Sequence, residues 1–189
     1  AFSAGVDLTA LNEVKLEDGA VGGSLNAAAR LLIHAIRTVP KPVVAKVNGF
    51  CFTGALEIAL ACDLFVVAEE AKLGDTHAKW GLRPTWGMSG RLAAAVGVVK
   101  AKELSFTART IKGTEAVEMG IANRAAPLEK LDGAVQTLLD EILPNSAGSI
   151  AAYKALYNAG ASASANAAVR FEESSEFEIG LNYWQTNLA

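Results

Sequence analysis

The run 42–64, which reads PVVAKVNGFCFTGALEIALACDL, constrains the fold of this chain more than any other segment. β-Branched residues form a short strand, an Asn-Gly turn closes it, and a helix of small apolar residues then begins at Thr53 or Gly54. The order strand, turn, helix indicates an α/β protein. Glu57 lies in the middle of this apolar helix, where an ionisable side chain needs a structural or a chemical reason.

The same alternation of strands and helices continues through the first two thirds of the chain. Ser24 is a candidate N-cap for a helix that runs to Thr38, just before Pro40. Further elements are expected in this order: strands at 64–70 and 71–76, helices from about Ser89 and over 98–108, a helix capped by Thr114 and ended by Gly120, and a short strand.

The last third shows helical spacing without strand signals. Three helical segments are expected, at 128–142, 146–158 and 164–180. We therefore predict an α/β core over residues 1–127 and a helical C-terminal region over residues 128–189.

Composition excludes several classes of function. The formal charge of −3 includes no Lys/Arg run, so nothing indicates binding to nucleic acid or to an anionic membrane. Two cysteines without CxxC spacing and two histidines cannot build a zinc cluster, and we expect reduced thiols, no metal and a cytoplasmic protein. The longest apolar stretch, 50–62, is interrupted by Glu57 and is too short to span a bilayer of about 30 Å, so no membrane span is expected.

Gly54 and Glu57 are spaced for chemistry as well as for capping. At the start of a helix, the Gly54 N–H is an unpaired donor, the helix dipole favours an anion there, and the missing Cβ lets a ligand carbonyl approach. Glu57 lies one turn further along and can project near the same point. Gly-x-x-Glu therefore suits an oxyanion donor beside an acid/base group, but it also suits a glutamate that caps its own helix.

Four segments in order carry a wider resemblance: FSAGVDL, KPVVAKVNGFCFTGALEIALACDL, KLGDTHAKWGLRPTWGMSGRLAAAVG and ARTIKGTEAVEMGIANRAAP. Together they closely resemble the crotonase (enoyl-CoA hydratase/isomerase) superfamily over residues 1 to about 127. The resemblance implies an α/β fold built as a spiral of β-β-α units with a helical C-terminal region. In that family a β-rich segment precedes FSAG, so the chain is expected to be N-terminally incomplete.

The resemblance also implies roles for individual residues. The backbone N–H groups of Val6 and Gly54 match the oxyanion hole that polarises a thioester carbonyl. Glu57 matches the first of two hydratase glutamates, and Asp7 matches an aspartate that is expected to be structural. The second glutamate falls twenty positions after the first, where this chain has His77.

His77 is the departure from the family pattern, and two interpretations stay open. Histidine can accept or donate a proton near neutral pH, so His77 is a candidate partner for Glu57. It could instead be a structural histidine, hydrogen-bonded within its loop close to Asp75 and Lys79. Trp80 and Trp86 flank the same loop and are expected to shape the acyl pocket, with core packing as the alternative.

The function implied by the resemblance is an acyl-CoA enzyme of fatty acid metabolism that hydrates a 2-enoyl-CoA to a 3-hydroxyacyl-CoA. An enoyl-CoA isomerase that uses one carboxylate and a non-catalytic acyl-CoA-binding protein are the alternatives.

No cofactor is expected, because coenzyme A is part of the substrate. The family implies a homotrimer or a dimer of trimers with the helical region at subunit contacts. Candidates to meet the CoA phosphates are Lys15, Lys79, Arg109 and Lys112.

Overall fold

The computed structural model of the protein describes residues 1–7, 16 and 19–161. Two three-stranded sheets form its centre. The first has the parallel order β1-β3-β6, and the second has the order β2-β4-β5, in which β4 pairs in parallel with β2 and antiparallel with β5. The strands are β1 (Val44–Val47), β2 (Cys51–Phe52), β3 (Leu64–Ala68), β4 (Lys72–Gly74), β5 (Ile111–Lys112) and β6 (Arg124–Ala126).

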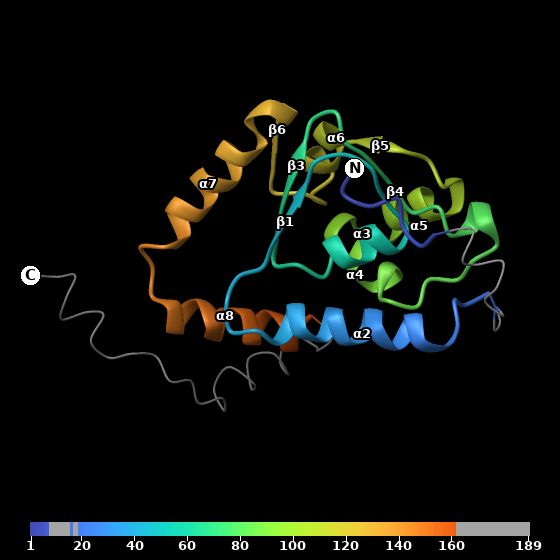
Figure 1. Ribbon diagram of the computed structural model, residues 1–189, viewed down its shortest axis with the longest axis horizontal. Helices are drawn as coiled ribbons and strands as arrows, with labels where there is room; N and C mark the ends of the chain where they lie inside the picture. The colour runs from blue at the N-terminus through green and yellow to red at the C-terminus, as the bar shows by residue number, and fades with distance from the viewer. Residues whose placement is uncertain (8–15, 17–18, 162–189) are drawn as a thin grey trace, which may run out of the picture.

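Helices follow each pair of strands and cover the sheets (Figure 1). They are α2 (Gly23–Thr38), α3 (Gly54–Ala59), the 3₁₀ turn η1 (Ala78–Trp80), α4 (Met88–Val96), α5 (Val98–Thr107), α6 (Gly113–Glu118), η2 (Leu128–Lys130), α7 (Leu131–Ile142) and α8 (Ala147–Gly160). The chain passes twice through one strand of the first sheet, one strand of the second sheet and then helix: β1, β2, α3, and β3, β4, α4 with α5. This order agrees with the expected spiral of β-β-α units.

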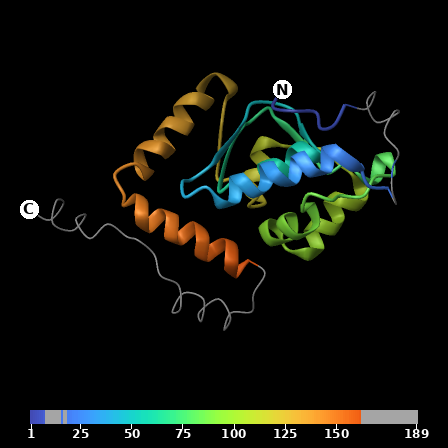
Figure 2. The ribbon, with the colours of Figure 1, turned by 60° about the horizontal axis from the view of Figure 1, so that its bottom comes forward.

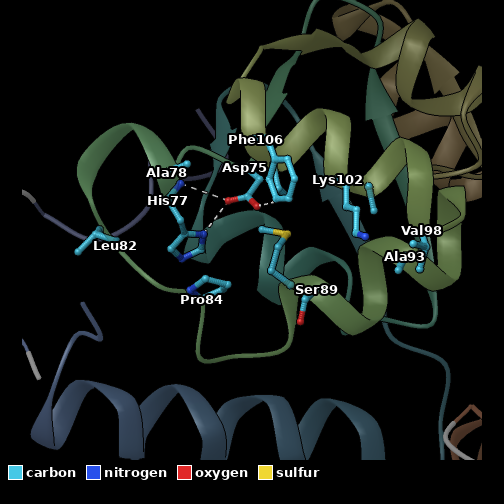
Figure 3. A pocket seen from close by; sticks show the side chains of 13 residues that line it. Asp75, His77, Ala78, Leu82, Pro84, Ser89, Ala93, Val98, Lys102 and Phe106 are labelled. Atoms are coloured by element: carbon cyan, nitrogen blue, oxygen red, sulfur yellow. Dashed lines mark hydrogen bonds and ion pairs between the residues drawn. The ribbon is translucent and has the colours of Figure 1, made fainter. Parts of the chain in front are cut away.

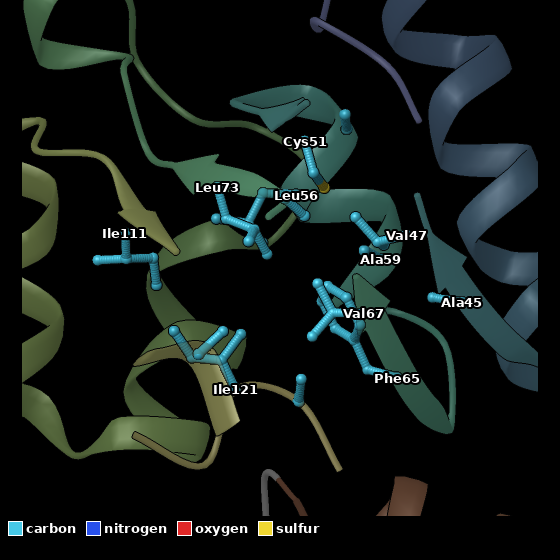
Figure 4. Packing of buried hydrophobic residues seen from close by; sticks show 14 of the residues in the cluster. Ala45, Val47, Cys51, Leu56, Ala59, Phe65, Val67, Leu73, Ile111 and Ile121 are labelled. Carbon is cyan, nitrogen blue, oxygen red and sulfur yellow. The ribbon is translucent and has the colours of Figure 1, made fainter. Parts of the chain in front are cut away.

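The hydrophobic core lies between the two sheets and the helices α3 to α7 (Figure 4). Val47, Val67 and Leu73 are 0% exposed, and Leu131 and Leu138 of α7 belong to the same cluster. Full burial of such a side chain contributes about 1.5–3 kcal/mol, so these strands are held mainly by packing. Because α7 shares this core, this helix is not independent of the sheets.

Helices α7 and α8 form the opposite end of the molecule from α4 and α5 (Figure 2). Helix α8 lies alongside the C-terminal end of α2, where Asn158 donates a hydrogen bond to the Arg37 carbonyl. After β6, the described residues through 161 contain only helices and turns. The predicted helices at 128–142 and 146–158 are thereby confirmed, while the segment 164–180 lies outside the described residues.

Several boundaries differ from the sequence predictions. The predicted cap at Ser24 is wrong, because α2 already begins at Gly23 after an extended Gly22. The predicted cap at Thr114 is also wrong, since α6 begins at Gly113 with Lys112 before it and no side-chain cap. Gly120 does end α6, with a φ of 80° that favours glycine. The two-residue strands β2 and β5 were not predicted.

Three expected absences concern the part of the chain that the structure describes. No helix in the described ranges is long and apolar enough to cross a membrane. No group of three or more metal-binding side chains lies together among these residues. Cys51 and Cys62 are free thiols, and burial raises the pKa of Cys51 to about 12 and that of Cys62 to about 11, so neither is an activated nucleophile.

Candidate active site

The N-terminal segment and strand β2 bring Val6 and Gly54 to one cavity. Ser3 bridges Cys51 in parallel, and the Ser3 N–H donates to the Phe50 carbonyl at 2.8 Å. Val6 and Gly54 each follow this bridge by three residues, and both line the same cavity. Among the described residues, neither of their backbone N–H groups donates to a protein acceptor. Two residues whose N–H groups are free within the described ranges therefore border one cavity.

Thr53 turns the chain from β2 into α3 in a conformation that threonine rarely adopts. Its φ is 54° and its ψ −114°, which is unfavourable for a β-branched residue. The Thr53 N–H donates to the Gly74 carbonyl at 2.9 Å, and its hydroxyl contacts the Thr76 hydroxyl. These bonds hold the strained residue in place, and the strained turn determines the direction of the next N–H group, that of Gly54.

A cavity of about 380 Å³ opens beside these two donors. Its walls are Ser3, Gly5, Val6, Asp7, Leu25, Gly54, Ala55, Ile58 and Trp86. The Trp86 ring lies directly against Gly54, because a Cβ built on Gly54 would be 2.4 Å from a ring carbon. The Trp86 Nε1–H donates to Asn26 Oδ1 of α2 at 2.6 Å, which anchors the indole. Trp86 thus forms a wall of this cavity, and its role in an acyl pocket stays a prediction.

Glu57 turns its carboxyl group away from the start of its own helix. Oε1 accepts hydrogen bonds from the backbone N–H groups of Trp86, at 2.9 Å, and Met88, at 3.0 Å. No side chain caps α3 at Thr53. The interpretation of Glu57 as the cap of its own helix is therefore wrong. Its second oxygen, Oε2, lies 3.6 Å from Nε2 of His77, and Glu57 is only 1% exposed.

His77 is held between two carboxyl groups. It follows β4 at the start of η1, and its Nδ1 lies 2.6 Å from Oδ1 of Asp75 while its Nε2 faces Glu57. The same Asp75 oxygen accepts the backbone N–H of His77 at 3.2 Å, and Oδ2 accepts the Ser105 hydroxyl at 2.7 Å. His77 is thus hydrogen-bonded within its loop, as the structural interpretation expected, and it also faces Glu57, as the chemical interpretation expected.

The two carboxyl groups differ in their readiness to ionise. Burial raises the pKa of Glu57, and the Met88 N–H, the nearby His77 and the Trp86 N–H offset this only in part. Burial acts on Asp75 in the same direction, but hydrogen bonds from His77 and Ser105 outweigh it and lower the pKa of Asp75 below its usual range. The arrangement therefore favours a proton on Glu57 and an ionised Asp75.

A second cavity, of about 430 Å³, is bordered by His77 (Figure 3). Its walls are largely apolar and come from η1, the loop after it, α4 and α5, including Leu82, Pro84, Met88, Val98 and Phe106. His77 and Asp75 line it as well, whereas the first cavity borders Gly54 and Trp86. Glu57 connects the two: it faces His77 of the second cavity and accepts the backbone N–H of Trp86 of the first.

Other candidate residues lie away from these cavities. Trp80 is 51% exposed, lines none of the cavities described above, and has the Lys79 ammonium 5.8 Å from its ring centre, so its place in an acyl pocket stays a prediction. Arg109 pairs with Glu115 at 2.7 Å and with Glu103 at 3.5 Å. Lys15 lies outside the described residues. None of the candidates for the CoA phosphates is assigned.

Sequence reasoning missed the role of Asp75 and the strain at Thr53. The available signal for Asp75 was the spacing Asp-x-His directly after a strand, because side chains two residues apart can meet when a turn follows. The sequence at Thr53 gave no sign of this strain, because threonine is common in strands and rarely adopts a positive φ.

Comparison with known proteins agrees with this geometry. The family model described as enoyl-CoA hydratase/isomerase matches residues 1–180. The short-chain-enoyl-CoA hydratase of Clostridium acetobutylicum is 30% identical over 91% of this chain, and human enoyl-CoA hydratase domain-containing protein 2, mitochondrial, is 40% identical over 77%. The chain spans 65% and 50% of the lengths of these two relatives.

Solved structures show the same fold. An enoyl-CoA hydratase from Bacillus anthracis superposes with a TM-score of 0.76 at 24% identity, over 98% of this chain and 64% of that one. An enoyl-CoA hydratase from Polaromonas has a TM-score of 0.72 at 25% identity, over 86% and 60%. The chain belongs to the enoyl-CoA hydratase/isomerase family, the crotonase superfamily that its four motifs resemble.

Proposed function

We propose that the protein hydrates a 2-enoyl-CoA thioester to a 3-hydroxyacyl-CoA. The observation that carries this proposal is the buried pair formed by Glu57 Oε2 and His77 Nε2, 3.6 Å apart. Trp86, whose backbone N–H donates to Glu57, lines the cavity that Val6 and Gly54 border. The names of the relatives, among them the crotonyl-CoA hydratase of Syntrophomonas wolfei at 32% identity, support the same reaction.

The oxyanion hole consists of the Val6 and Gly54 N–H groups in this proposal. The thioester carbonyl enters the cavity of about 380 Å³ and accepts both hydrogen bonds. The reaction moves negative charge onto that oxygen, and one such donor is worth roughly 3 kcal/mol of transition-state stabilisation. The strained Thr53 and the Trp86 ring keep the Gly54 N–H in place before substrate arrives.

Proton transfer falls to Glu57 and His77. A water held between them loses a proton to Nε2 of His77, and its oxygen forms the bond to the β-carbon. Glu57, whose pKa is raised by burial, breaks its O–H bond and delivers that proton to the α-carbon. The proton from Glu57 forms the new C–H bond at the α-carbon, one hydrogen of the water stays in the new hydroxyl group, and the other stays on His77. Transfer of this water-derived proton from His77 to Glu57 restores the starting state.

Replacement of Glu57 by glutamine tests the proposal. Glu57→Gln keeps the acceptor for the Trp86 and Met88 N–H groups but removes the acid, so crotonyl-CoA hydration by the full-length protein is expected to fall by about 100-fold or more. The matched control is Glu118→Gln, an exposed carboxylate on α6, which leaves the rate unchanged. Undiminished turnover in Glu57→Gln would contradict the acid/base role.

Enoyl-CoA isomerisation is the second candidate, and the histidine at position 77 favours it. An isomerase moves one proton between two carbons with a single carboxylate, and Glu57 is the single carboxylate that faces both His77 and the loop before α4. Rates on a panel of 2-enoyl and 3-enoyl-CoA thioesters distinguish the two reactions. Binding of acyl-CoA without turnover of any thioester in this panel would indicate the third alternative, a non-catalytic acyl-CoA-binding protein.

Three further points belong to the proposal. We expect no cofactor, because coenzyme A enters with the substrate. We also propose a homotrimer or a dimer of trimers, supported by the exposed side chains of Tyr153 and Tyr157 on α8. The cytoplasmic location stays a prediction, since the human relative is named as mitochondrial.

A further inference from the structure

Asp75 makes more contacts with His77 than a neighbour two residues away requires. Its Oδ1 lies 2.6 Å from His77 Nδ1 and 3.2 Å from the His77 backbone nitrogen, so one oxygen fixes both the ring and the chain. Its Oδ2 accepts the Ser105 hydroxyl of α5 at 2.7 Å. Asp75 is 4% exposed and His77 7% exposed. The carboxylate is thus held at both oxygens and cannot rotate away from the ring.

We propose that Asp75 is a positioning residue, which keeps the proton of the neutral His77 ring on Nδ1 and the lone pair on Nε2, toward Glu57. The inference rests on the proposed function for its catalytic consequence, but the tautomer itself is a property of the protein alone. The hydrogen bonds of Asp75 are to His77 and Ser105, so its link to the Glu57–His77 pair is through the imidazole ring.

The geometry excludes the other tautomer on energetic grounds. With the proton on Nε2, the Nδ1 lone pair would face a carboxylate oxygen at 2.6 Å in a buried site, so two acceptors would be in contact without a proton between them. With the proton on Nδ1, the contact becomes a charge-assisted hydrogen bond. Nε2 then has the lone pair that accepts a proton from water, and a protonated Glu57 Oε2 can lie opposite it.

The tautomer can be measured without any substrate. The chain has two histidines, His34 and His77, so His34→Gln leaves a single imidazole for nitrogen-15 NMR of the full chain. At alkaline pH, where the ring carries one proton, we expect the coupling pattern of the Nδ1–H tautomer. In Asp75→Leu the acceptor for the Nδ1 proton and for the His77 backbone N–H is absent, and the pattern should change toward Nε2–H. An Nε2–H pattern in the protein with Asp75 intact would overturn the proposal.

Activity provides the second readout. Asp75→Leu is expected to lower kcat for crotonyl-CoA hydration by about 100-fold with KM changed less than about threefold, because the wrong tautomer has no lone pair at Nε2. In a His77→Gln background the same substitution should cost less than about threefold more, since the hydrogen bonds of Asp75 reach the site through the ring. Equal losses from Asp75→Leu in both backgrounds would contradict a positioning role.

Two controls separate the possible failures. Ser105→Ala removes one hydrogen bond to Asp75 and should lower kcat less than Asp75→Leu while leaving the Nδ1–H tautomer in place. A protein with the Nδ1–H pattern but no hydration in any variant would refute the proposed function and leave the Asp75–His77 assignment standing. A hydratase whose His77 stays Nδ1–H in Asp75→Leu would refute the positioning role alone.

Discussion

At the level of single residues, the carboxyl group of Glu57 connects three parts of the molecule. It lies on α3, accepts two backbone N–H groups from the loop before α4, and faces the histidine that follows β4. Burial raises the pKa of this group more than the Met88 and Trp86 N–H groups and His77 lower it, and the charge of Asp75 raises it further. The fold therefore keeps a carboxyl group at a buried position where an apolar side chain would make the folded protein more stable. Functional groups commonly lower stability in this way.

This cost predicts how stability depends on pH. The folded-state pKa of Glu57 lies above its unfolded value, so its contribution to stability is fully present below the unfolded pKa and is lost as pH rises through the folded pKa. The glutamine side chain in Glu57→Gln does not titrate, so this variant lacks that pH dependence. We therefore expect the unfolding free energy of the variant minus that of the natural protein to increase with pH, by at most about 1.4 kcal/mol per pH unit. Urea unfolding between about pH 4 and about pH 8 measures this. A difference that is independent of pH would contradict it.

The sequence predicts part of the site for physical reasons. Gly54 and Glu57 are one helical turn apart, so local spacing predicts that they lie on one face of the helix, whereas the direction of the Glu57 carboxyl is set by the Trp86 and Met88 N–H groups of a distant loop. The meeting of Glu57 with His77 depends on the pairing of β2 with β4, which no local pattern encodes, and it was expected only from the resemblance. The role of Asp75 depends on the turn after β4, and the same limit applies there.

At the level of elements, length separates the correct predictions from the missed ones. β1 and β3 have four and five residues with β-branched, buried positions, and α5 has ten residues with helical spacing, so each has a clear pattern. β2 and β5 have two residues each, too few for any periodicity, and they exist because they pair with β4. Their sequences carry no strand signal of their own.

Helix α6 provides a test of how closely the elements pack. Gly113 begins this helix against the end of β3, and a Cβ there would lie 2.0 Å from the Ala68 carbonyl oxygen. Because backbone must move, Gly113→Ala is expected to destabilise the protein by about 3 kcal/mol, measured by urea unfolding. The control is Gly133→Ala on α7, where no atom lies within 4 Å of the added Cβ and a gain of about 0.5–1 kcal/mol is expected. Equal effects of the two changes would contradict close packing at α6.

At the level of the whole molecule, one buried lysine holds α8 against the rest of the chain. Lys154 Nζ donates to the Ile36 carbonyl at 2.6 Å, to the Lys41 carbonyl at 2.9 Å and to Asp63 Oδ2 at 2.7 Å. Its side chain is 6% exposed, and each of its three donors has an acceptor. The ammonium thus joins the end of α2, the segment before β1 and the turn before β3 to the last described helix.

Removal of this ammonium is expected to loosen α8 and to lower the unfolding free energy of the whole protein. Lys154→Met leaves the Asp63 carboxylate with the Val43 N–H alone and two carbonyl groups without their donor, so we expect a loss of about 3 kcal/mol in unfolding free energy. The control is Lys46→Met, which removes a solvent-exposed pair with Asp132 and should cost less than about 1 kcal/mol. Hydrogen exchange should become faster in α8 for Lys154→Met and stay unchanged there for Lys46→Met. If both substitutions leave α8 equally protected, then α8 is held by its apolar contacts and not by Lys154.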